Sequence, residues 1–412
     1  MAQQETIAII GAGVIGSGVA CVLAREGRRV LLIDRDAPGE AGASFGNAGH
    51  IATELLEPLP SPGLLFGFWR LLTAFDGPLH IPARRVPTFL PWAIRFAMAA
   101  FRREANTRHL APFVRPAADA LEELLREIGR PELLRRQGHY ELWLNRGAAR
   151  RAARQASLMA RLEVPTAPAP AELLEAASRA ARAGEIAGLG FPKCAYVVDP
   201  LEIVRAFASA AAEHGATVIR RNVRALVKRG GSIEVVSGAD TVVVSSVVVC
   251  AGAWSAALLQ PFGLVIPLEA ARGYHVEMPG AKPLIDAPIL YQDQNTFVTP
   301  MTGRLRSTSF MEFAGVDAPP DPRHPAQLRR TLIDLGYPAD AMQASWMGPR
   351  PVLPDYLPAI GRVAGVPNLL YAFGHQHLGL TLSAVTARAV ADLVADRAPP
   401  AHVAAFDLRR FR

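Results

Sequence analysis

The stretch TIAIIGAGVIGSGVACVLAREGRRVLLID (6–34) decides the fold of this chain. An apolar segment, a glycine turn, a segment with helical apolar spacing and a second apolar segment together predict a βαβ unit. Gly11, Gly13 and Gly16 form the turn, where glycine lets the backbone approach a pyrophosphate whose charge the helix amides meet. Asp34 ends the second strand, where a carboxylate accepts hydrogen bonds from ribose hydroxyls. The unit predicts a dinucleotide site that fits NAD and FAD alike, with further contacts from Val14, Ile15 and Arg35.

Length and composition indicate a globular protein of two domains. The chain has 412 residues, of which 50% are hydrophobic and 20% charged. Cys21, Cys194 and Cys250 form no CxxC pair and have no histidine at metal spacing, so we expect neither a disulfide scaffold nor a metal site. The net charge of +7 comes without a recognised nucleic-acid-binding module, so nucleic acid is not an expected partner. The first residues carry no leader pattern, and we expect a cytoplasmic protein.

The basic and aromatic segment RRVPTFLPWAIRFAMAAFRR (84–103) raises the question of a membrane. It contains no run of about 18 apolar residues, so it does not predict a spanning helix. With Trp92, Phe96 and Phe101 facing lipid and Arg95, Arg102 and Arg103 facing headgroups, it predicts peripheral contact with the inner face of the cell membrane. Packing of the same helix against its own protein is the alternative.

The rest of the chain changes pattern several times. Residues 111–190 read mostly as helices, and 199–220 read as a helix with an aspartate N-cap followed by a strand. The β-branched run 241–254 predicts one buried strand. Residues 266–345 alternate as in an antiparallel sheet, and 368–395 return to a strand, a glycine turn and a helix.

Three further stretches resemble the D-amino acid oxidase superfamily of flavoproteins. They are GASFGNAGHI (42–51), VVVCAGAWS (247–255) and GHQHLGLTLSAVT (374–386), so the resemblance reaches both ends and the middle of the chain. It implies noncovalently bound FAD, held at the glycine turn and at these stretches. The implied contacts are Ala43, Ser44, Asn47, Ala48, Gly49, Val223, Ala251, Gly252, Trp254 and Gly374.

The last of these stretches is implied to face the pyrimidine end of the flavin with the N-terminus of a helix. Leu378, Gly379, Leu380 and Thr381 would supply the backbone amides. Reduced flavin carries negative charge near N1 and O2, and N–H groups at the start of a helix stabilise an anion. An ordinary turn between a strand and a helix is the alternative.

The segment WMGPRPVLPDYLPAIGR (346–362) resembles the part of the superfamily that anchors the substrate. There Arg350 would pair with the amino acid carboxylate, because a guanidinium fork matches a carboxylate with two hydrogen bonds. In ARGYHVEM, Tyr274 would donate a further hydrogen bond to that carboxylate. Arg272 or His275 would line the same face, unless they are exposed strand side chains.

Three histidines fall in the motifs that are implied to lie near the flavin. They are His50, His375 and His377, and we take His50 and His375 as the better catalytic pair. A histidine on a loop is more often a structural residue, which is the alternative for each. Residues 300–362 contain no cysteine, so a covalent flavin tether near Arg350 is not expected.

These patterns together predict an α/β protein with two interleaved domains. A Rossmann-like FAD-binding domain would comprise residues 1–80, 191–265 and 346–412. An α+β substrate domain built on an antiparallel sheet would comprise residues 81–190 and 266–345.

Within the superfamily the chain most resembles bacterial D-amino acid dehydrogenases, including those that act on hydroxy-D-proline. The resemblance implies oxidation of a small amino acid, with D-proline and hydroxy-D-proline among the candidates, by hydride transfer from Cα to flavin N5. The electrons would pass to a quinone or an electron-transfer partner. Gln376 departs from the commoner Gly-His-Gly pattern, which leaves the side-chain preference open. The alternatives are an oxygen-dependent oxidase of the glycine or sarcosine type and a non-catalytic flavin-binding subunit of a complex.

Overall fold

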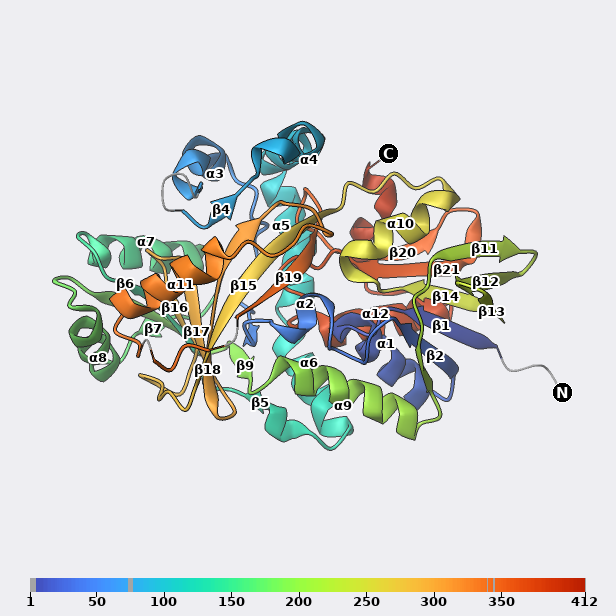
Figure 1. Ribbon diagram of the computed structural model, residues 1–412, viewed down its shortest axis with the longest axis horizontal. Coiled ribbons are helices and arrows are strands. Elements are labelled where there is room, and N and C mark those ends of the chain that lie inside the picture. Colours follow the sequence, from blue (N-terminus) through green and yellow to red (C-terminus); the bar gives the residue numbers. More distant parts are fainter. Residues whose placement is uncertain (1–4, 73–76, 339, 344, 412) are drawn as a thin grey trace.

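The glycine turn follows the first strand of a six-stranded sheet with the order β10–β2–β1–β14–β21–β20. The computed structural model describes residues 5–72, 77–338, 340–343 and 345–411. All neighbouring strands run parallel except β20, which is antiparallel to β21. Because β14 and β21 follow β1 across the sheet, distant parts of the chain meet the N-terminal strand (Figure 1). The strands are β1 (Thr6–Ile10), β2 (Arg29–Asp34), β10 (Thr217–Arg220), β14 (Ser246–Val249), β20 (Ala359–Val363) and β21 (Val366–Phe373).

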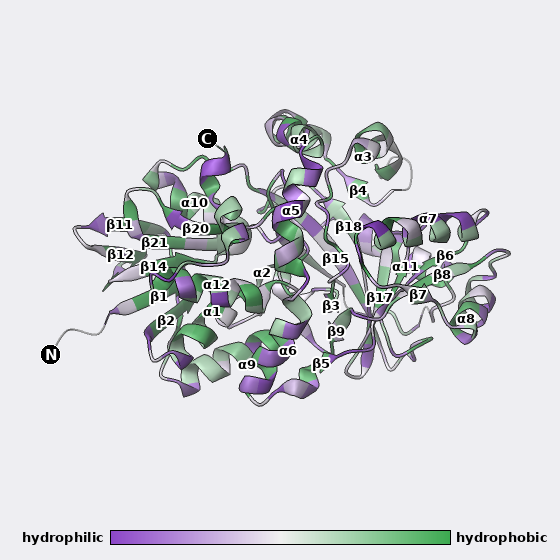
Figure 2. Ribbon diagram, turned by 180° about the vertical axis from the view of Figure 1, so that it is seen from behind, coloured by the Kyte–Doolittle hydropathy of each residue, from purple (hydrophilic) through white to green (hydrophobic). Residues whose placement is uncertain are grey.

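Both faces of this sheet are buried, as parallel sheets require. Ile7 and Ile9 face a core shared with three helices, and Ala8 and Ile10 face a second core under a β-ribbon and a short helix. Figure 2 shows hydrophobic residues along β14 and β21 accordingly. The helices of the first core are α1 (Val14–Arg25), α9 (Pro200–Glu213) and α12 (Ser383–Val394). The second core includes β11 (Ala225–Arg229), β12 (Ser232–Ser237), β13 (Asp240–Val244) and α10 (Ser255–Leu259).

A nine-stranded sheet forms the other half of the molecule (Figure 1). Its pairs are antiparallel except for β16 with β6 and β18 with β4, which are parallel. The strands are β4 (Leu79–His80), β6 (His139–Trp143), β7 (Ala167–Pro168), β8 (Ala187–Phe191), β15 (Glu269–Pro279), β16 (Ile289–Tyr291), β17 (Thr296–Met301), β18 (Arg304–Glu312) and β19 (Ser345–Val352). The helices α7 (Ala148–Arg161), α8 (Ala171–Ala181) and α11 (Arg323–Asp334) lie beside it. The predicted α/β class with a second sheet is therefore confirmed.

Shorter elements connect and cover the two sheets. The remaining helices are α2 (Gly42–Phe45), α3 (Pro62–Gly67), α4 (Val86–Ala100), α5 (Arg103–Val114) and α6 (Ala117–Glu127). A small sheet joins β3 (His50–Ile51), β9 (Ala195–Val197) and β5 (Leu134–Arg135). Turns of 3₁₀ helix lie at Phe68–Leu71, Ala83–Arg85, Pro131–Leu133, Gly252–Trp254, Gln260–Phe262, Ala401–Phe406 and Leu408–Phe411.

Several predicted elements are confirmed. The βαβ unit is present, and Asp199 caps α9 because its Oδ1 atom accepts the Leu201 N–H at 2.9 Å. The alternating region 266–345 forms β15 to β18 together with α11. The stretch 368–395 forms the end of β21, a turn and α12.

Two predicted elements differ from the structure. The region 111–190 contains the strands β5 to β8 as well as helices, and these strands are short enough to be hidden among alanine, leucine and arginine. The run 241–254 forms two strands instead of one. Its break is at Ser245, whose N–H donates to the Thr6 carbonyl at 3.0 Å, so that β13 joins the ribbon and β14 joins the parallel sheet.

The predicted domain boundaries cut across the observed packing in two places. Strand β19 pairs with β15 in the nine-stranded sheet, although residues from 346 onward were assigned to the cofactor domain. Helices α5 and α6 bury Phe113 and Leu121 in the core of α1 and α12, although they were assigned to the substrate domain. The division into domains stays a prediction. No helix in the described residues is long and apolar enough to cross a membrane.

Candidate active site

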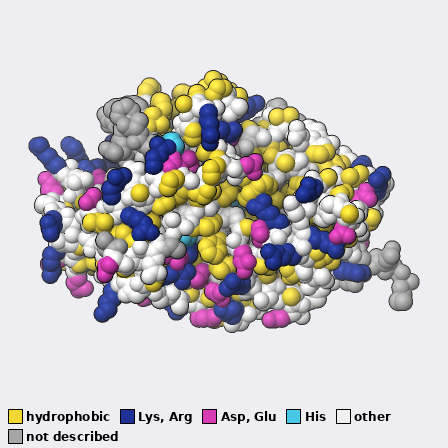
Figure 3. Space-filling model, viewed as in Figure 1, with side chains coloured by type: hydrophobic (Ala, Val, Ile, Leu, Met, Phe, Trp, Pro, Cys, Tyr) yellow, Lys and Arg dark blue, Asp and Glu magenta, His cyan; other side chains and the backbone are white. Residues whose placement is uncertain are grey.

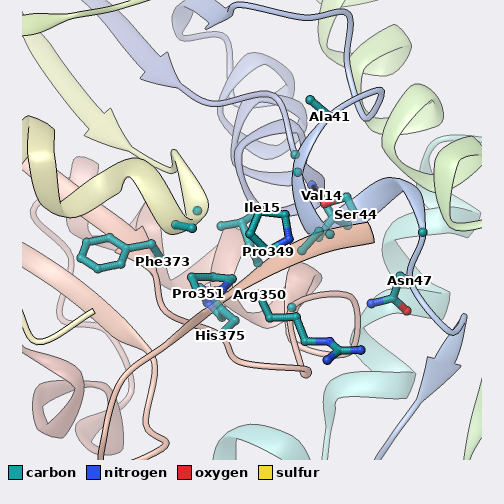
Figure 4. A pocket seen from close by; sticks show the side chains of 18 of the residues that line it. Val14, Ile15, Ala41, Ser44, Asn47, Pro349, Arg350, Pro351, Phe373 and His375 are labelled. Carbon is teal, nitrogen blue, oxygen red and sulfur yellow. Dashed lines mark hydrogen bonds between the residues drawn. The ribbon is translucent and has the colours of Figure 1, made fainter. Parts of the chain in front are cut away.

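A cavity of about 540 Å³ lies between the two sheets, beyond the carboxyl ends of β1, β14 and β21. Ligands of open α/β sheets bind at this end of the strands. The nine-stranded sheet contributes residues of β15, β18 and β19 to the opposite wall. Figure 4 shows side chains from separate segments around this one cavity, among them Val14, Ser44, Arg350 and His375.

The glycine turn at the cavity permits no larger residue at two of its positions. Gly11 has a φ of +107°, and a Cβ there would lie 2.5 Å from the Cys250 carbonyl oxygen. A Cβ on Gly16 would lie 1.8 Å from the Gly11 oxygen. The Oδ2 atom of Asp34 accepts the Ala12 N–H at 2.6 Å, which holds the carboxylate beside the turn. Because glycine has no side chain, a ligand can approach the backbone of this turn closely.

The loop 42–51 folds over the glycine turn. The Ser44 hydroxyl accepts the Val14 N–H at 3.0 Å, at the first residue of α1. On the neighbouring wall, the Arg35 guanidinium lies over the Trp254 ring with 4.3 Å between Cζ and the ring centroid. This pairing of a cation with an aromatic face holds the end of β2 against the turn after β14.

The turn after β21 differs from the prediction, because α12 begins only at Ser383. Residues 378–381 therefore precede the helix, and the Leu378 N–H is already bonded to the His375 carbonyl at 2.8 Å. Within the described chain, the structure shows no acceptor for the N–H groups of Gly379, Leu380 and Thr381. Of these, Gly379 and Leu380 line the cavity, where their amides are free to bind an anionic or carbonyl group of a ligand.

Arg350 is a cation in the cavity without an anionic partner. In the described residues no carboxylate forms a salt bridge with it, and its Nη1 atom donates to the Phe310 carbonyl at 3.0 Å. Burial lowers the pKa of Arg350. A Cβ on Gly273 would lie 2.0 Å from Arg350 Nη2, so the guanidinium lies flat against this glycine of β15. A glycine inside a strand marks such a close approach, and sequence reasoning had not used this signal.

The comparisons with known proteins match this architecture. A family model described as "DAO: FAD dependent oxidoreductase" matches residues 6–393. The chain belongs to this family. It is 32% identical to a D-amino-acid oxidase of Bradyrhizobium diazoefficiens, over the full length of both chains. It is 31% identical to a D-amino acid dehydrogenase of Paramagnetospirillum magneticum, with 95% of each chain covered.

Among solved structures, the chain is similar to the glycine oxidase of Geobacillus kaustophilus. The TM-score is 0.76 with 23% sequence identity, and 98% of each chain is covered. This likeness supports the fold. Family membership makes the chain an FAD-dependent oxidoreductase, as the sequence resemblance had implied.

The residues at the cavity fit the FAD of this family. The glycine turn offers an open backbone at the start of α1 for the pyrophosphate, and Asp34 stands beside it for the ribose. The free amides of Gly379 and Leu380 would meet the negative end of the flavin. Of the predicted cofactor contacts, the cavity is lined by Gly11, Gly13, Val14, Ile15, Asp34, Arg35, Ala43, Ser44, Asn47, Ala48, Val223, Ala251, Gly252, Trp254, Gly379 and Leu380.

Five predicted contacts lie behind the cavity wall. Gly16 packs on Gly11, and the Thr381 hydroxyl accepts the Ala52 N–H at 3.0 Å. The other three are Gly49, Gly374 and Leu378, of which the glycines have positive φ values and Leu378 belongs to the core of α1. Their role is to shape the wall, and direct contact with FAD stays a prediction for them.

Tyr274 does not occupy the predicted place beside Arg350. Its hydroxyl donates to Glu312 Oε2 at 2.6 Å and accepts the Asp321 N–H at 3.0 Å. Successive side chains of a strand point to opposite faces, and Arg350 lies on the face of Gly273. The Tyr274 hydroxyl therefore points to the other face, although Tyr274 is among the residues that line the cavity. The expected hydrogen bond to the substrate carboxylate stays a prediction.

Arg272 and His275 are not among the residues that line the cavity. Arg272 lies on the Tyr274 side, where its Nε atom is 3.3 Å from Glu312 Oε2. His275 lies on the Arg350 side, but its ring stacks on Trp346 with centroids 5.3 Å apart. Burial, followed by the nearby Arg306, lowers the pKa of His275 to about 4. Both residues hold the sheet in place.

His375 and His377 differ in how far their side chains are exposed. His375 lines the cavity but is 2% exposed, and its Nε2 atom is 3.0 Å from the Thr386 hydroxyl. Burial lowers the pKa of His375 to about 3. His377, which we had ranked lower, is open to the cavity. Enclosure by protein, followed by the charge of Arg350, lowers the pKa of His377 to about 4, so it is neutral at neutral pH.

Backbone strain gathers around Arg350. Three residues other than glycine have left-handed φ values there: Phe310 at +70°, Tyr356 at +61° and Gln376 at +54°. The Phe310 carbonyl accepts from Arg350, and the Gln376 side chain accepts the Leu353 N–H at 3.1 Å and donates to the Leu357 carbonyl at 3.3 Å. Such conformations cost about 1–3 kcal/mol each and concentrate at functional sites. The strain at Gln376 directs His377 into the cavity.

His50 belongs to a buried polar group that the sequence did not reveal. Its Nε2 atom is 2.9 Å from Glu54 Oε1, and the Cys194 thiol donates to Glu54 Oε2 at 2.9 Å. His139 lies near, with Nε2 3.9 Å from Glu54 Oε1. These four side chains could hold a metal ion, although the expectation from spacing was that no metal site exists. His50 and Glu54 are four residues apart, whereas only the fold brings His139 of β6 and Cys194, which precedes β9, beside them.

Proposed function

We propose that the chain oxidises a small D-amino acid at this cavity. The observation that carries the proposal is Arg350, an enclosed guanidinium with no anionic partner in the described chain. Leaving a cation buried without a partner is costly, whereas a carboxylate would bind the guanidinium fork with two hydrogen bonds. The relatives named D-amino-acid oxidase and D-amino acid dehydrogenase support the D configuration.

The cavity supplies the binding and orientation that such a reaction needs. When bound, FAD accepts a hydride from the substrate Cα at N5. Arg350 anchors the carboxylate, and neutral His377 stands near it to accept a hydrogen bond from the amine. The amine lone pair forms the carbon–nitrogen double bond as the hydride leaves, so no protein base is needed for the C–H step. The imino acid then hydrolyses in water.

The electron acceptor and the side-chain preference form the finer part of the proposal. We infer a quinone or an electron-transfer partner as acceptor, and a position on the inner face of the cell membrane where a quinone would be reached. D-Proline and hydroxy-D-proline are among the candidates, because Gln376 departs from the commoner Gly-His-Gly pattern in this turn and leaves the side-chain preference open. The relative named D-amino-acid oxidase favours oxygen as the competing acceptor.

Anaerobic flavin bleaching tests this function. The purified holoenzyme is mixed with D- and L-amino acids, including both enantiomers of proline and hydroxyproline. We expect loss of the yellow flavin absorbance with one or more D-amino acids, and no loss with their enantiomers. Reoxidation is then compared with quinone, dye and oxygen, where peroxide formation at a comparable rate identifies an oxidase. A flavin that no amino acid bleaches would contradict the proposal and favour a non-catalytic subunit.

A further inference from the structure

One side of helix α4 is apolar and exposed to solvent. Val86, Leu90, Ile94, Met98 and Phe101 follow one another at intervals of three or four residues, so they lie on one side of the helix. Their exposed fractions run from 48% to 79%. We name these five residues the α4 face. A soluble helix normally turns such a stripe toward its own core.

The core takes the other side of α4. Phe89 and Trp92 are buried there against Phe313 and Val352, and the Trp92 indole N–H donates to the Val352 carbonyl at 3.2 Å. Packing against the protein therefore explains only one of the two apolar sides. Of the three aromatic residues expected to face lipid, Trp92 is buried and Phe96 packs against this core, and only Phe101 is exposed.

Arginines flank the α4 face, and the sequence places Glu104 directly after Arg103. Residues 77–103 contain five arginines and no aspartate or glutamate. Arg85 pairs with Glu269 and Arg103 pairs with Glu57, each at 2.9 Å. Arg84, Arg95 and Arg102 are exposed and form no salt bridge with the described residues. Figure 3 shows hydrophobic and basic side chains together at the upper edge of the molecule, where α4 lies in Figure 1.

The neighbouring α3 continues this surface. Helices α3 and α4 pack beside each other at that edge (Figure 1). Phe66 at the end of α3 is 85% exposed, and Phe68 in the following turn is 50% exposed. Large aromatic side chains beside a basic helix are typical of segments that lie in the interfacial region of a membrane.

We propose that the α4 face, with Phe66 and Phe68, docks the protein on an anionic lipid bilayer. The apolar side chains enter the headgroup–acyl boundary, and the three unpaired arginines contact anionic headgroups. Charge favours lipid over a second copy of this chain. A two-fold contact would place the same arginine-rich patches against each other, with no carboxylate from residues 77–103 to pair with them.

This docking places the bilayer next to the cavity. Val352, which accepts the Trp92 hydrogen bond, ends the strand β19 that carries Arg350. Only the body of helix α4 and the strand β19 therefore separate the α4 face from the cavity wall. The delivery of electrons to a membrane quinone rests on the proposed function, whereas bilayer binding itself needs neither substrate nor turnover.

Vesicle sedimentation of the yellow holoenzyme tests the docking. Vesicles of phosphatidylcholine with phosphatidylglycerol are compared with vesicles of phosphatidylcholine alone, at low and at high salt. We expect binding to the anionic vesicles that weakens with salt. A double variant Leu90→Glu/Ile94→Glu should lose this binding, and Arg95→Gln should weaken the partitioning about five-fold. Both variants should retain flavin and dye reduction, because the altered side chains point away from the core.

Val243→Glu is the matched control, because Val243 is an exposed valine on β13, far along the chain from α4. It should bind anionic vesicles as the unchanged protein does. Absence of binding to anionic vesicles at low salt would overturn the proposal. A lipid-free dimer that Leu90→Glu/Ile94→Glu dissociates would also overturn it, because the α4 face would then join two chains. Flavin bleaching that persists in either case leaves the proposed function standing.

Discussion

Arg350 is the residue on which the proposed substrate binding depends. Its guanidinium lies against Gly273 and donates to the Phe310 carbonyl. No carboxylate of the described residues forms a salt bridge with it. A fixed fork of donors without a partner is a recognition element for a planar anion. The strained residues Phe310 and Tyr356 on neighbouring segments show that the protein maintains this arrangement at a cost in free energy.

Arg350→Lys should raise the apparent Michaelis constant for the amino acid about ten- to a hundred-fold. Lysine keeps the charge but loses the two parallel hydrogen bonds, and bonds to charged groups contribute about 1.5–3 kcal/mol. The visible spectrum of the bound flavin should stay unchanged. Steady-state kinetics with Arg388→Lys, a change in a surface ion pair, provide the control. Unchanged kinetics in Arg350→Lys would remove this residue from the substrate site.

His377 should act as a neutral hydrogen-bonding group. His377→Leu should lower kcat/KM about five- to ten-fold, because one hydrogen bond of about 1 kcal/mol is lost. His377→Gln should retain most of the activity, since an amide also bonds without charge. Kinetics under saturating acceptor measure both effects. Equal activity of the leucine variant and the unchanged enzyme would show that His377 only lines the cavity.

At the scale of elements, the turn between β1 and α1 decides whether the cofactor binds. Gly11→Ala should yield protein without flavin, because the new Cβ meets the Cys250 carbonyl and the φ of +107° is strained for alanine. Absorbance of the purified protein measures this loss.

A second glycine provides the control for Gly11→Ala. Gly215 also has a positive φ of +89°, but a Cβ there would meet nothing within 4 Å. Gly215→Ala should therefore keep the flavin and cost only about 1–2 kcal/mol of stability. Full flavin content in Gly11→Ala would contradict the assignment of this turn to the cofactor.

At the scale of the whole molecule, elements with a regular sequence pattern could be predicted. The direction in which individual side chains point in the folded protein could not. The βαβ unit follows from apolar periodicity and glycine spacing, so 6–34 revealed both the sheet and the cofactor turn. The side of β15 that Tyr274 faces depends on the register with β19, which no local pattern records. His375 is buried and His377 is exposed, on either side of the left-handed backbone at Gln376, and the local sequence does not record this difference. The strands β6 and β8 were missed because their sequences, HYELW and AGLGF, contain no β-branched residue.

Buried histidines should make the folded protein sensitive to acid. Burial lowers the pKa of both His139 and His375 to about 3, whereas an unfolded histidine has a pKa of about 6.5. The unfolded chain therefore binds more protons below about pH 6.5, and the free energy of unfolding falls as the pH drops toward 3. Each histidine should cost on the order of 2 kcal/mol at pH 5.

Urea unfolding at pH 7 and pH 5 measures this acid sensitivity. His375→Gln, which has no proton to gain, should show a smaller difference between the two pH values than the unchanged protein. A free energy of unfolding that is equal at both pH values would contradict the buried, neutral state of these rings.

The central claim is that distant parts of the chain enclose a single FAD between the glycine turn and the turn after β21. The most direct measurement is calorimetric titration of FAD into flavin-depleted protein, with flavin content measured after purification. We predict one FAD bound per chain and a yellow protein whose flavin is released on denaturation. A protein that is purified colourless and binds no added FAD would contradict the account.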